Sequence, residues 1–567
     1  MIAPTRPEPT PVVPVRPEPV RPEPTWLGAM RRHAAAAPGA VAITETAGRR
    51  VTRAQLLELV DSVVCALRER GMRTGDPVLF SVRPGIDALV LALAVHELGG
   101  VLLPMDPGVS DALFDTRMAM LRPTWVFAQG VLLASPRGIV ARLLRSRGLH
   151  FAPLGTVQGA TFVHVGPKLP GGPPSIAYSR LLRSGSRTVR LRAAAAATPS
   201  AEPSGGVDAA PDSESAAFIV CTSGTTSAPK AVIHSRRSLG AIIAAVQHEL
   251  ALNDADVLYA RDLHLIVPAL LAGARAVIPQ DRSFEGVRML SLVEREGITH
   301  AFLVTRDCRL LLDACVETGQ QVPDSLRSLM IGAAPVRAAF LSRLEAVLPA
   351  HTVAWCVYGA TEVLPVSRVS LREKTAYDGP GDLVGTPIPG VSVRVDADGH
   401  LCVSGDRLCT GYVGEPPVRE HRSGDLATLE DGRIVLRGRA TDMIIRGDHN
   451  IYPALYEPLV ERIAGVRRAA LLGDFDSAMA DERVVLVIEP EPGVDEAELT
   501  TRVRDAVRAG PLRLDSSAQP DRIVIATLPE SGRSHKLDKE ALRRQLGLAH
   551  VGAATSTAGA TTGATAT

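Results

Sequence analysis

Lysine is scarce in this chain of 567 residues. Only five of its 62 basic residues are lysine, and the others are arginine. A compact ammonium and a planar guanidinium are not interchangeable. Each lysine is therefore a candidate for a site that requires a small point charge. The five positions are Lys168, Lys230, Lys374, Lys536 and Lys539.

Cysteine pairs, long apolar runs and an excess of one charge are missing as well. The seven cysteines lie apart, without CxxC pairs or histidines at metal-ligand spacing, which favours reduced thiols over disulfides or a zinc site. No apolar run is long and charge-free enough to span a bilayer, and the first residues, MIAPTRPEPT, lack the pattern of a signal peptide. The net charge of +1 gives no reason to expect nucleic acid as a partner. Together these absences predict a cytoplasmic enzyme.

Composition divides the chain into segments. Residues 1–24 repeat a Pro-rich unit and residues 549–567 form an Ala/Thr/Gly tail, so both are predicted to be disordered. Because a chain of this length is too long for one compact core, we expect a large domain over 25–438 and a smaller one over 439–548. An Ala/Pro/Ser-rich stretch over 193–217 is predicted to be a flexible surface loop.

Helix and strand patterns alternate in the larger domain. Apolar residues recur at helical spacing over 51–71, and short apolar runs at 76–82, 216–224, 299–305 and 326–334 are typical of buried strands. This alternation predicts an α/β fold with a mainly parallel, helix-covered sheet. Shorter units in the last quarter of the chain predict a compact α+β domain.

The strongest motif is the nine-residue segment TSGTTSAPK, which directly follows an apolar strand pattern. Its glycine and hydroxyl residues supply N–H and O–H donors that can surround a polyphosphate, and its lysine adds a point charge. It is not a Walker A loop, because the second glycine is missing and Ala231 follows the lysine. A polar turn without a ligand is the alternative. The candidate phosphate-binding residues are Thr222, Ser223, Gly224, Thr225, Thr226 and Lys230.

This loop resembles the phosphate loop of the adenylate-forming superfamily, which includes acyl-CoA synthetases, luciferases and the adenylation domains of peptide synthetases. Further motifs of that superfamily follow in the expected order over roughly residues 215–545: IGAAP (331–335), YGATE (358–362), SGDL (423–426), GRATD (438–442) and KLDK (536–539). The resemblance implies helix-covered sheets in a large N-terminal domain and a smaller, mobile α+β C-terminal domain. Two departures stand out: Ser227 replaces a glycine, and Thr441 occupies a hinge position that is usually Asp or Lys.

The resemblance also implies the chemistry, which is the use of ATP and Mg²⁺ to convert a carboxylic acid into an acyl-AMP with release of pyrophosphate. Lys536 is expected to bridge the substrate carboxylate and the α-phosphate. Glu362 is expected to hold Mg²⁺, and Thr361 to bond a phosphate oxygen. Asp425 is expected to bind the ribose hydroxyls, with Arg439 at the ribose or phosphate edge. The other expected nucleotide contacts are Gly332, Ala333, Ala334, Pro335, Tyr358 and Gly359, and the expected hinge residues are Thr441 and Asp442.

Each role has an ordinary alternative. Tyr358 could be a core tyrosine, Asp425 a turn residue and Lys536 a solvated charge. Lys539 is the second candidate for the catalytic lysine, because Gly532 does not directly precede Lys536 as the family pattern requires.

The acid and the final acceptor stay open between several possibilities. The segment RGDHNIYPALYE resembles acyl-CoA synthetases and predicts a fatty or 3-hydroxy fatty acid passed to coenzyme A. YGATEVLPVS, the basic segment 130–151 and the spaced RSHK are similar to the β-lactone synthetases of olefin biosynthesis, which act without coenzyme A. That basic segment is also compatible with sheltering a fatty chain or with peripheral membrane contact.

Two alternatives lie further from the acyl-CoA synthetase pattern. One is activation of an amino acid or aryl acid for an acyl carrier protein, in which Asp262 would bind an amine. For Asp262 and the neighbouring His264, surface positions near a strand end are the simpler interpretation. The other alternative is a non-catalytic homologue that binds nucleotide.

Overall fold

The computed structural model describes most of the chain. The described residues are 25–109, 111–134, 151–196, 212–222, 230–280, 284–332, 338–439, 442–446, 449–476, 481–509, 512, 514, 518–531 and 536–549. Within these ranges no helix combines the length and the apolar character that a membrane crossing requires.

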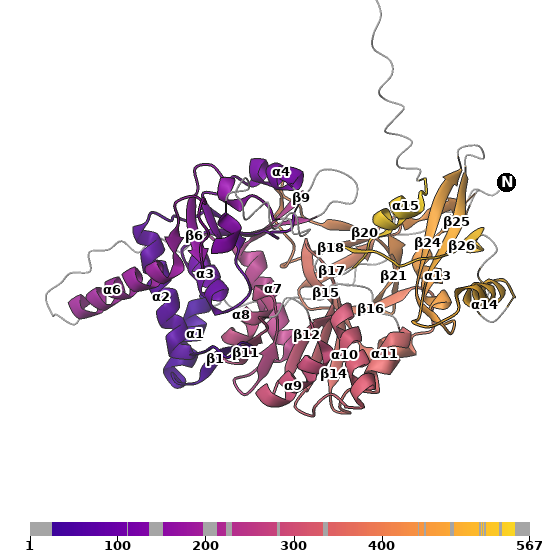
Figure 1. Ribbon diagram of the computed structural model, residues 1–567, viewed down its shortest axis with the longest axis horizontal. Helices are drawn as coiled ribbons and strands as arrows, with labels where there is room; N and C mark the ends of the chain where they lie inside the picture. The colour runs from indigo at the N-terminus through magenta and orange to yellow at the C-terminus, as the bar shows by residue number, and fades with distance from the viewer. Residues whose placement is uncertain are drawn as a thin grey trace, which may run out of the picture.

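Two large sheets dominate the part before residue 440 (Figure 1). In the described residues, the larger sheet has thirteen strands, in the spatial order β17 (Val391–Val395), β18 (His400–Gly405), β20 (His421–Glu430), β21 (Arg433–Arg439), β16 (Asp382–Pro387), β15 (Val363–Ser370), β14 (Val353–Ala360), β13 (Ser328–Gly332), β12 (His300–Val304), β10 (Val257–Tyr259), β11 (Arg275–Ile278), β1 (Val41–Glu45) and β2 (Arg50–Thr52). The eight strands described in the second sheet are β19 (Gly411–Tyr412), β9 (Lys230–Ser235), β8 (Ala216–Thr222), β4 (Val101–Pro104), β3 (Pro77–Ser81), β5 (Trp125–Gln129), β6 (Thr161–Val165) and β7 (Ile176–Ala177).

Helices cover and separate these sheets. They are α1 (Trp26–Ala36), α2 (Arg53–Glu69), α3 (Ile86–Glu97), α4 (Asp111–Leu121), α6 (Tyr178–Ala196), α7 (Arg236–Leu250), α8 (Leu263–Leu271), α9 (Gly286–Glu296), α10 (Thr305–Thr318), α11 (Ala338–Glu345) and α12 (Leu371–Ala376), with 3₁₀ turns η1 (Gly130–Leu133) and η2 (Leu154–Thr156). The helix predicted over 51–71 is confirmed as α2, which begins with a capping box between Thr52 and Gln55. The mixed α/β class is confirmed.

The prediction of a mainly parallel sheet is wrong for part of the molecule. Parallel pairing joins β1, β11, β10, β12, β13 and β14, but every pair from β14 through β15, β16, β21, β20 and β18 to β17 is antiparallel. Several of these later strands are joined by short turns, such as the one between β14 and β15. A short turn can connect only antiparallel neighbours.

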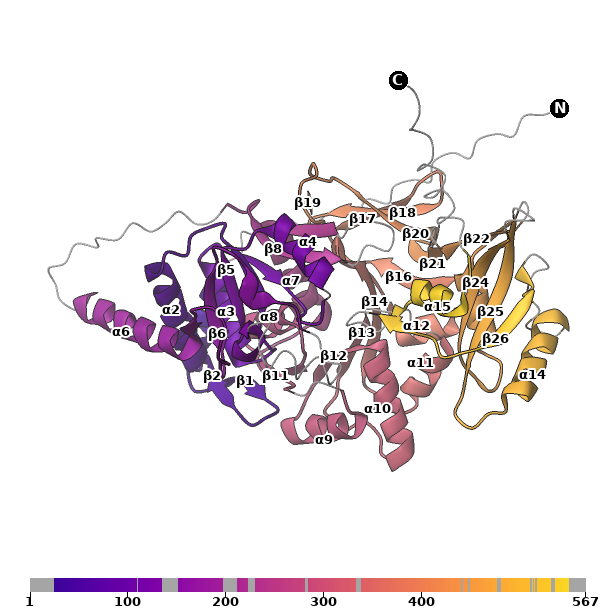
Figure 2. The same ribbon diagram turned by 45° about the horizontal axis from the view of Figure 1, so that its top comes forward.

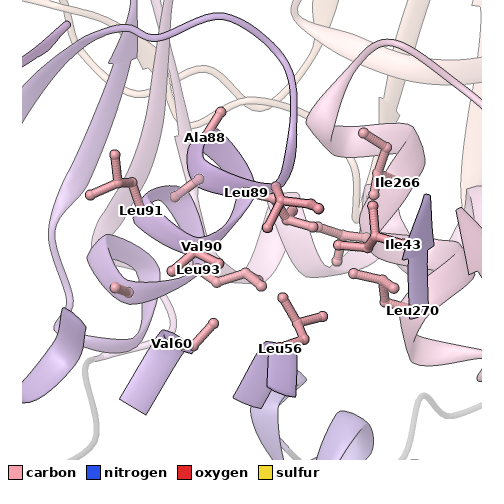
Figure 3. Close-up of a cluster of buried hydrophobic side chains, with 14 of the residues drawn as sticks. Ile43, Leu56, Val60, Ala88, Leu89, Val90, Leu91, Leu93, Ile266 and Leu270 are labelled. Atoms are coloured by element: carbon pink, nitrogen blue, oxygen red, sulfur yellow. The ribbon is translucent and has the colours of Figure 1, made fainter. Parts of the chain in front are cut away.

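Helix α3 shows how the two sheets are held together. Nine of its twelve residues are buried, as expected for a helix that is apolar on all sides. Figure 3 shows Leu89 and Leu91 of α3 in the same cluster as Leu56 of α2 and Ile266 of α8. The cluster also contains Ile43 of the larger sheet, together with Val78, Phe80 and Phe127 of the smaller sheet. One continuous apolar core therefore fixes both sheets relative to each other.

The region after residue 440 forms a smaller α+β unit, as predicted. It contains β22 (Ile444–Arg446), β23 (His449–Ile451), α13 (Pro453–Val460), β24 (Val466–Asp476), β25 (Asp481–Pro490), α14 (Glu496–Ala509), β26 (Arg522–Ile525), β27 (Glu530–Ser531), β28 (Lys536–Leu537) and α15 (Lys539–Leu546). Alternate residues of β25 pack on opposite faces: Val484 and Leu486 contact the α13–α14 side, and Val485 and Val487 contact Leu542 of α15. In Figures 1 and 2 this unit lies at the end of the molecule opposite α6.

Several predicted segments lie wholly or partly outside the described residues. These are both predicted disordered ends, most of segment 130–151 and residues 197–211 of the predicted loop. The predicted loop over 193–217 is too long at both ends, because α6 continues to Ala196 and β8 begins at Ala216. The boundary between domains at 438/439 stays a prediction.

Candidate active site

The candidate site begins at the carboxyl ends of two adjacent parallel strands. Gly332 ends β13, while Tyr358 and Gly359 lie near the end of β14, and the register pairs Ile331 with Cys356. In open α/β sheets this edge is where ligands bind. Ala333, Ala334 and Pro335 follow directly but lie outside the described residues.

The predicted phosphate loop connects β8 and β9. These strands pair antiparallel with Thr222 opposite Lys230, so the loop closes a hairpin. Ser223, Gly224, Thr225 and Thr226 lie outside the described residues, as does Ser227. At the exit of the loop, the Lys230 ammonium lies 4.8 Å from the centroid of the Tyr412 ring, within the range of a cation–π interaction.

Thr361 and Glu362 form the turn between β14 and β15, because Ala360 pairs with Val363. His234 Nε2 donates to the Thr361 carbonyl oxygen at 2.8 Å. The His234 pKa is lowered by burial, although the Thr361 hydrogen bond and the Glu362 charge raise it. A neutral imidazole therefore holds the backbone of this turn.

The Glu362 carboxylate has a defined orientation. Its Oε1 accepts a hydrogen bond from the Tyr412 hydroxyl at 3.1 Å, and its Oε2 lies 3.8 Å from His421 Nε2. The His421 pKa is lowered by burial and by Lys230, whereas Glu362 and Asp425 raise it. Lys230, Glu362 and Asp425 thus all lie within electrostatic reach of His421.

Asp425 is the centre of a second group. It is 7% exposed; its Oδ2 accepts from the Tyr358 hydroxyl at 2.6 Å and its Oδ1 from Arg439 Nε at 3.0 Å. Arg439 stands directly opposite Asp425 in the β20–β21 pair. Burial raises the Tyr358 pKa, and the charge of Asp425 raises it further, so the phenol remains a donor.

The C-terminal unit brings Lys536 to this group. The surrounding protein lowers the Lys536 pKa even though the residue keeps contact with solvent. Arg439 lowers it further, whereas Asp425 raises it. The ammonium therefore lies within electrostatic reach of two predicted nucleotide-binding residues from another part of the chain.

A family model described as AMP-binding enzyme matches residues 30–413, which is more than half of the chain. The chain belongs to this family. The predicted adenylate-forming superfamily is confirmed, and by family the chain is an adenylate-forming ligase.

Two curated relatives and one solved structure illustrate the similarity. An isonitrile lipopeptide synthase of Streptomyces coeruleorubidus is 27% identical over 554 residues, which are 93% of this chain, but the chain spans only 34% of that protein. An olefin β-lactone synthetase of Stenotrophomonas maltophilia is 27% identical over 463 residues, with 73% of this chain and 76% of the relative covered. The structure of o-succinylbenzoate coenzyme A synthetase from Bacillus subtilis with ATP and magnesium matches with a TM-score of 0.69 at 18% identity, covering 93% of this chain and 99% of that one. This last match confirms the fold.

Lys539, the second candidate lysine of this AMP-binding enzyme, has a different environment from Lys536. Its ammonium lies 2.9 Å from Glu457 Oε1 and 3.5 Å from Asp442 Oδ2. It therefore ties α15 to α13 and to one of the two predicted hinge residues. The other, Thr441, lies outside the described residues.

Three residues of the site were not predicted from the sequence: His234, Tyr412 and His421. Of these three, only His421 could have been found from the sequence. It precedes Ser423 and Asp425 by two and four residues in β20, and alternate residues of a strand share a face. Tyr412 reaches the site through the pairing of β19 with β9, which no local pattern reveals.

Asp262 and His264 do not join the site residues through any contact described in the structure. Asp262 is exposed at the start of α8, and its side chain makes no capping hydrogen bond there. His264 lies in the first turn of the same helix and is partly buried. The simpler interpretation of Asp262 as a surface residue is confirmed.

The donor set around Glu362 fits magnesium better than a transition metal. Among the described residues no three His, Cys, Asp or Glu side chains converge as a metal cluster. Mg²⁺ usually binds one or two carboxylates and completes its shell with water and substrate phosphates. A single oriented carboxylate beside Lys230 and the phosphate-loop hairpin matches that requirement.

Proposed function

We propose that this AMP-binding enzyme uses ATP to activate a fatty or 3-hydroxy fatty acid as an acyl-AMP, releases pyrophosphate, and passes the acyl group to coenzyme A. The observation that carries the proposal is the hydrogen-bonded group of Asp425, Tyr358 and Arg439. Lys536 of the C-terminal unit lies within electrostatic reach of Asp425 and Arg439. Glu362, oriented by Tyr412, is linked to Asp425 through His421, which both carboxylates influence electrostatically. These cationic and acidic groups match the charge of an α-phosphate and the hydroxyls of a ribose.

The charges match the reaction. A carboxylate oxygen attacks the α-phosphorus, and the bond to the leaving pyrophosphate breaks, so negative charge accumulates on both sides of the phosphorus. Lys536 neutralises the substrate carboxylate and an α-phosphate oxygen, and Lys230 neutralises the departing phosphates. Glu362 would hold Mg²⁺, which supplies further charge neutralisation when bound.

The remaining groups orient the nucleotide. Asp425 accepts hydrogen bonds from the ribose hydroxyls, which requires the Tyr358 hydroxyl to share or release Oδ2. Arg439 holds the other carboxylate oxygen and keeps it facing the site. Gly332 and Gly359 lie at the same sheet edge, where the adenine is expected, and their lack of a side chain accommodates the close approach of Phe302 and Leu364.

Lactone formation is the second candidate for the final step. It is favoured by the 27% identity to an olefin β-lactone synthetase over 73% of this chain. In that case the 3-hydroxyl of the acyl-AMP attacks the acyl carbon, and AMP leaves without coenzyme A.

The test is pyrophosphate release by the purified protein with Mg-ATP and a panel of acids, each with and without coenzyme A. The panel contains saturated fatty acids, 3-hydroxy fatty acids, amino acids and aryl acids. We expect release with fatty-type acids and turnover that depends on coenzyme A. Turnover restricted to 3-hydroxy acids without coenzyme A would favour the lactone. Release only with amino or aryl acids would contradict the proposed acid class.

A further inference from the structure

Tyr412 lies where the two large sheets meet beside the candidate site. It belongs to β19, an edge strand of the smaller sheet, and pairs with Val232 of β9. Its hydroxyl and its ring contact residues that come from different sheets. Glu362 follows β14 of the larger sheet, whereas Lys230 begins β9 of the smaller sheet.

The backbone around Tyr412 is also hydrogen-bonded to residues of both large sheets. The Cys409 N–H donates to the Glu362 carbonyl oxygen at 2.7 Å. The Thr410 and Val413 N–H groups donate to the carbonyl oxygens of Ile233 and Ala231, at 2.8 and 3.0 Å. Residues 409–413, which we call the strap, therefore join the turn that carries Glu362 to the strand that begins with Lys230.

The side chain of Tyr412 also connects Glu362 with Lys230. Its hydroxyl donates to Glu362 Oε1 at 3.1 Å, and its ring lies 4.8 Å from the Lys230 ammonium. Burial and the nearby Glu362 charge raise the Tyr412 pKa, so the hydroxyl stays protonated at neutral pH. One rigid aromatic side chain thus contacts both a candidate Mg²⁺ ligand and a candidate phosphate ligand.

We infer that Tyr412 is a positioning residue that sets the placement of Glu362 and Lys230 and thereby the binding of Mg-ATP. The inference rests on the proposed function. The two contacts are chemically separable. The hydroxyl orients the carboxylate, which matters when magnesium accompanies ATP, and the ring supports the ammonium, which matters with or without metal.

The experiment compares ATP binding by calorimetry, with Mg²⁺ and with EDTA, for wild type, Tyr412→Phe and Tyr412→Leu. Tyr412→Phe loses only the hydroxyl, and we expect Mg-ATP affinity to fall about tenfold, the effect of one hydrogen bond to a charged group, with metal-free binding little changed. Tyr412→Leu also loses the ring, so metal-free ATP binding should weaken too. The Tyr412→Phe loss should appear mainly in KM for Mg-ATP.

Tyr377→Phe is the matched control, because the Tyr377 hydroxyl donates to Glu430 at 3.2 Å away from the site. Unchanged Mg-ATP affinity in Tyr412→Phe, or a lowered melting temperature with unchanged affinity in both Tyr412 variants, would overturn the inference and leave the strap a structural feature. If wild type binds ATP and releases pyrophosphate, such a result leaves the proposed function intact. If wild type does not bind ATP, the proposed function fails and the inference fails with it.

Discussion

At the residue scale, the chemistry of Lys536 follows from its neighbours. The surrounding protein disfavours the charged form of its side chain, Arg439 repels the charge, and Asp425 attracts it. The net effect lowers the Lys536 pKa below its ordinary value of 10.5. With a lowered pKa, the ammonium loses its proton at a lower pH than that of an unperturbed lysine.

We therefore expect the rate of adenylation to fall with rising pH, with a midpoint below 10.5. The measurement is the pH profile of kcat/KM, which reports groups of the free enzyme. Lys536→Arg retains its charge throughout this range and should lose the alkaline limb, at a reduced overall rate. The same limb in the Arg variant would show that another group titrates.

Lys539 provides the opposite case, a lysine retained for structure. Its partner Glu457 is 5% exposed and also accepts a hydrogen bond from the Leu471 N–H at 2.9 Å. Removing one partner from a buried ion pair is costly, so Lys539→Met should lower the free energy of unfolding of the C-terminal unit by roughly 2–4 kcal/mol. Lys536→Met, at an exposed position, should cost less than about 0.5 kcal/mol. Urea denaturation of both variants checks this, and equal midpoints for the two would contradict it.

The scarcity of lysine identified five candidate functional residues but did not indicate which of them are structural. Lys374 is 5% exposed; it pairs with Asp382 and donates to the Leu383 carbonyl oxygen at 2.8 Å. Lys168 donates to the Pro173 carbonyl oxygen. Together with Lys539, these are structural contacts. Of the five lysines, Lys230 and Lys536 lie at the candidate site. The motifs had favoured these two and kept Lys539 as a second candidate for the catalytic lysine.

At the element scale, Arg407 holds the connections around β15 in place. It is 4% exposed, and its guanidinium donates to the carbonyl oxygens of Pro365, Ile388 and Pro389 at 2.8–3.1 Å. Burial lowers its pKa to about 10, which still leaves it charged at neutral pH. The guanidinium thereby joins β15, which begins directly after Glu362, to the segment between β16 and β17.

Arg407→Met should lower the free energy of unfolding by roughly 2–4 kcal/mol, because three carbonyl oxygens lose their buried donor. Thermal or urea denaturation measures this directly. Arg372→Met is the control, since that side chain is 76% exposed and should contribute less than about 0.5 kcal/mol. An Arg407→Met midpoint equal to that of the control would show that these hydrogen bonds add little.

Helices and strands that form because of a local apolar pattern could be predicted, whereas strands that depend on pairing with distant segments could not. The apolar periodicity of α2 and the short apolar runs of β3, β8, β12 and β13 were sufficient to predict them. The antiparallel half of the larger sheet and the two-residue strand β19 were not predicted. Their existence depends on pairing between distant segments, which apolar periodicity does not encode.

At the scale of the whole molecule, the site is assembled from three bodies. The smaller sheet contributes Lys230, the larger sheet contributes Glu362 and Asp425, and the C-terminal unit contributes Lys536. The shared core around α3 fixes the two sheets, so the position of the C-terminal unit decides whether Lys536 reaches Asp425 and Arg439 of the candidate site. The motifs named most residues of the candidate site. The strap residues and His234 required the folded chain, whereas His421 could have been found from its alternation with Ser423 and Asp425.

The central claim is that these three bodies form one adenylating site. Acid-dependent exchange of labelled pyrophosphate into ATP tests it most directly, in wild type and in Lys536→Met. We expect exchange in wild type with a fatty or 3-hydroxy fatty acid. In Lys536→Met we expect a loss of about 10²–10³-fold, as for other preorganised donors at a reacting centre, while ATP binding persists. ATP binding without acid-dependent exchange in wild type across the acid panel would contradict the claim and indicate a nucleotide-binding homologue without adenylating activity.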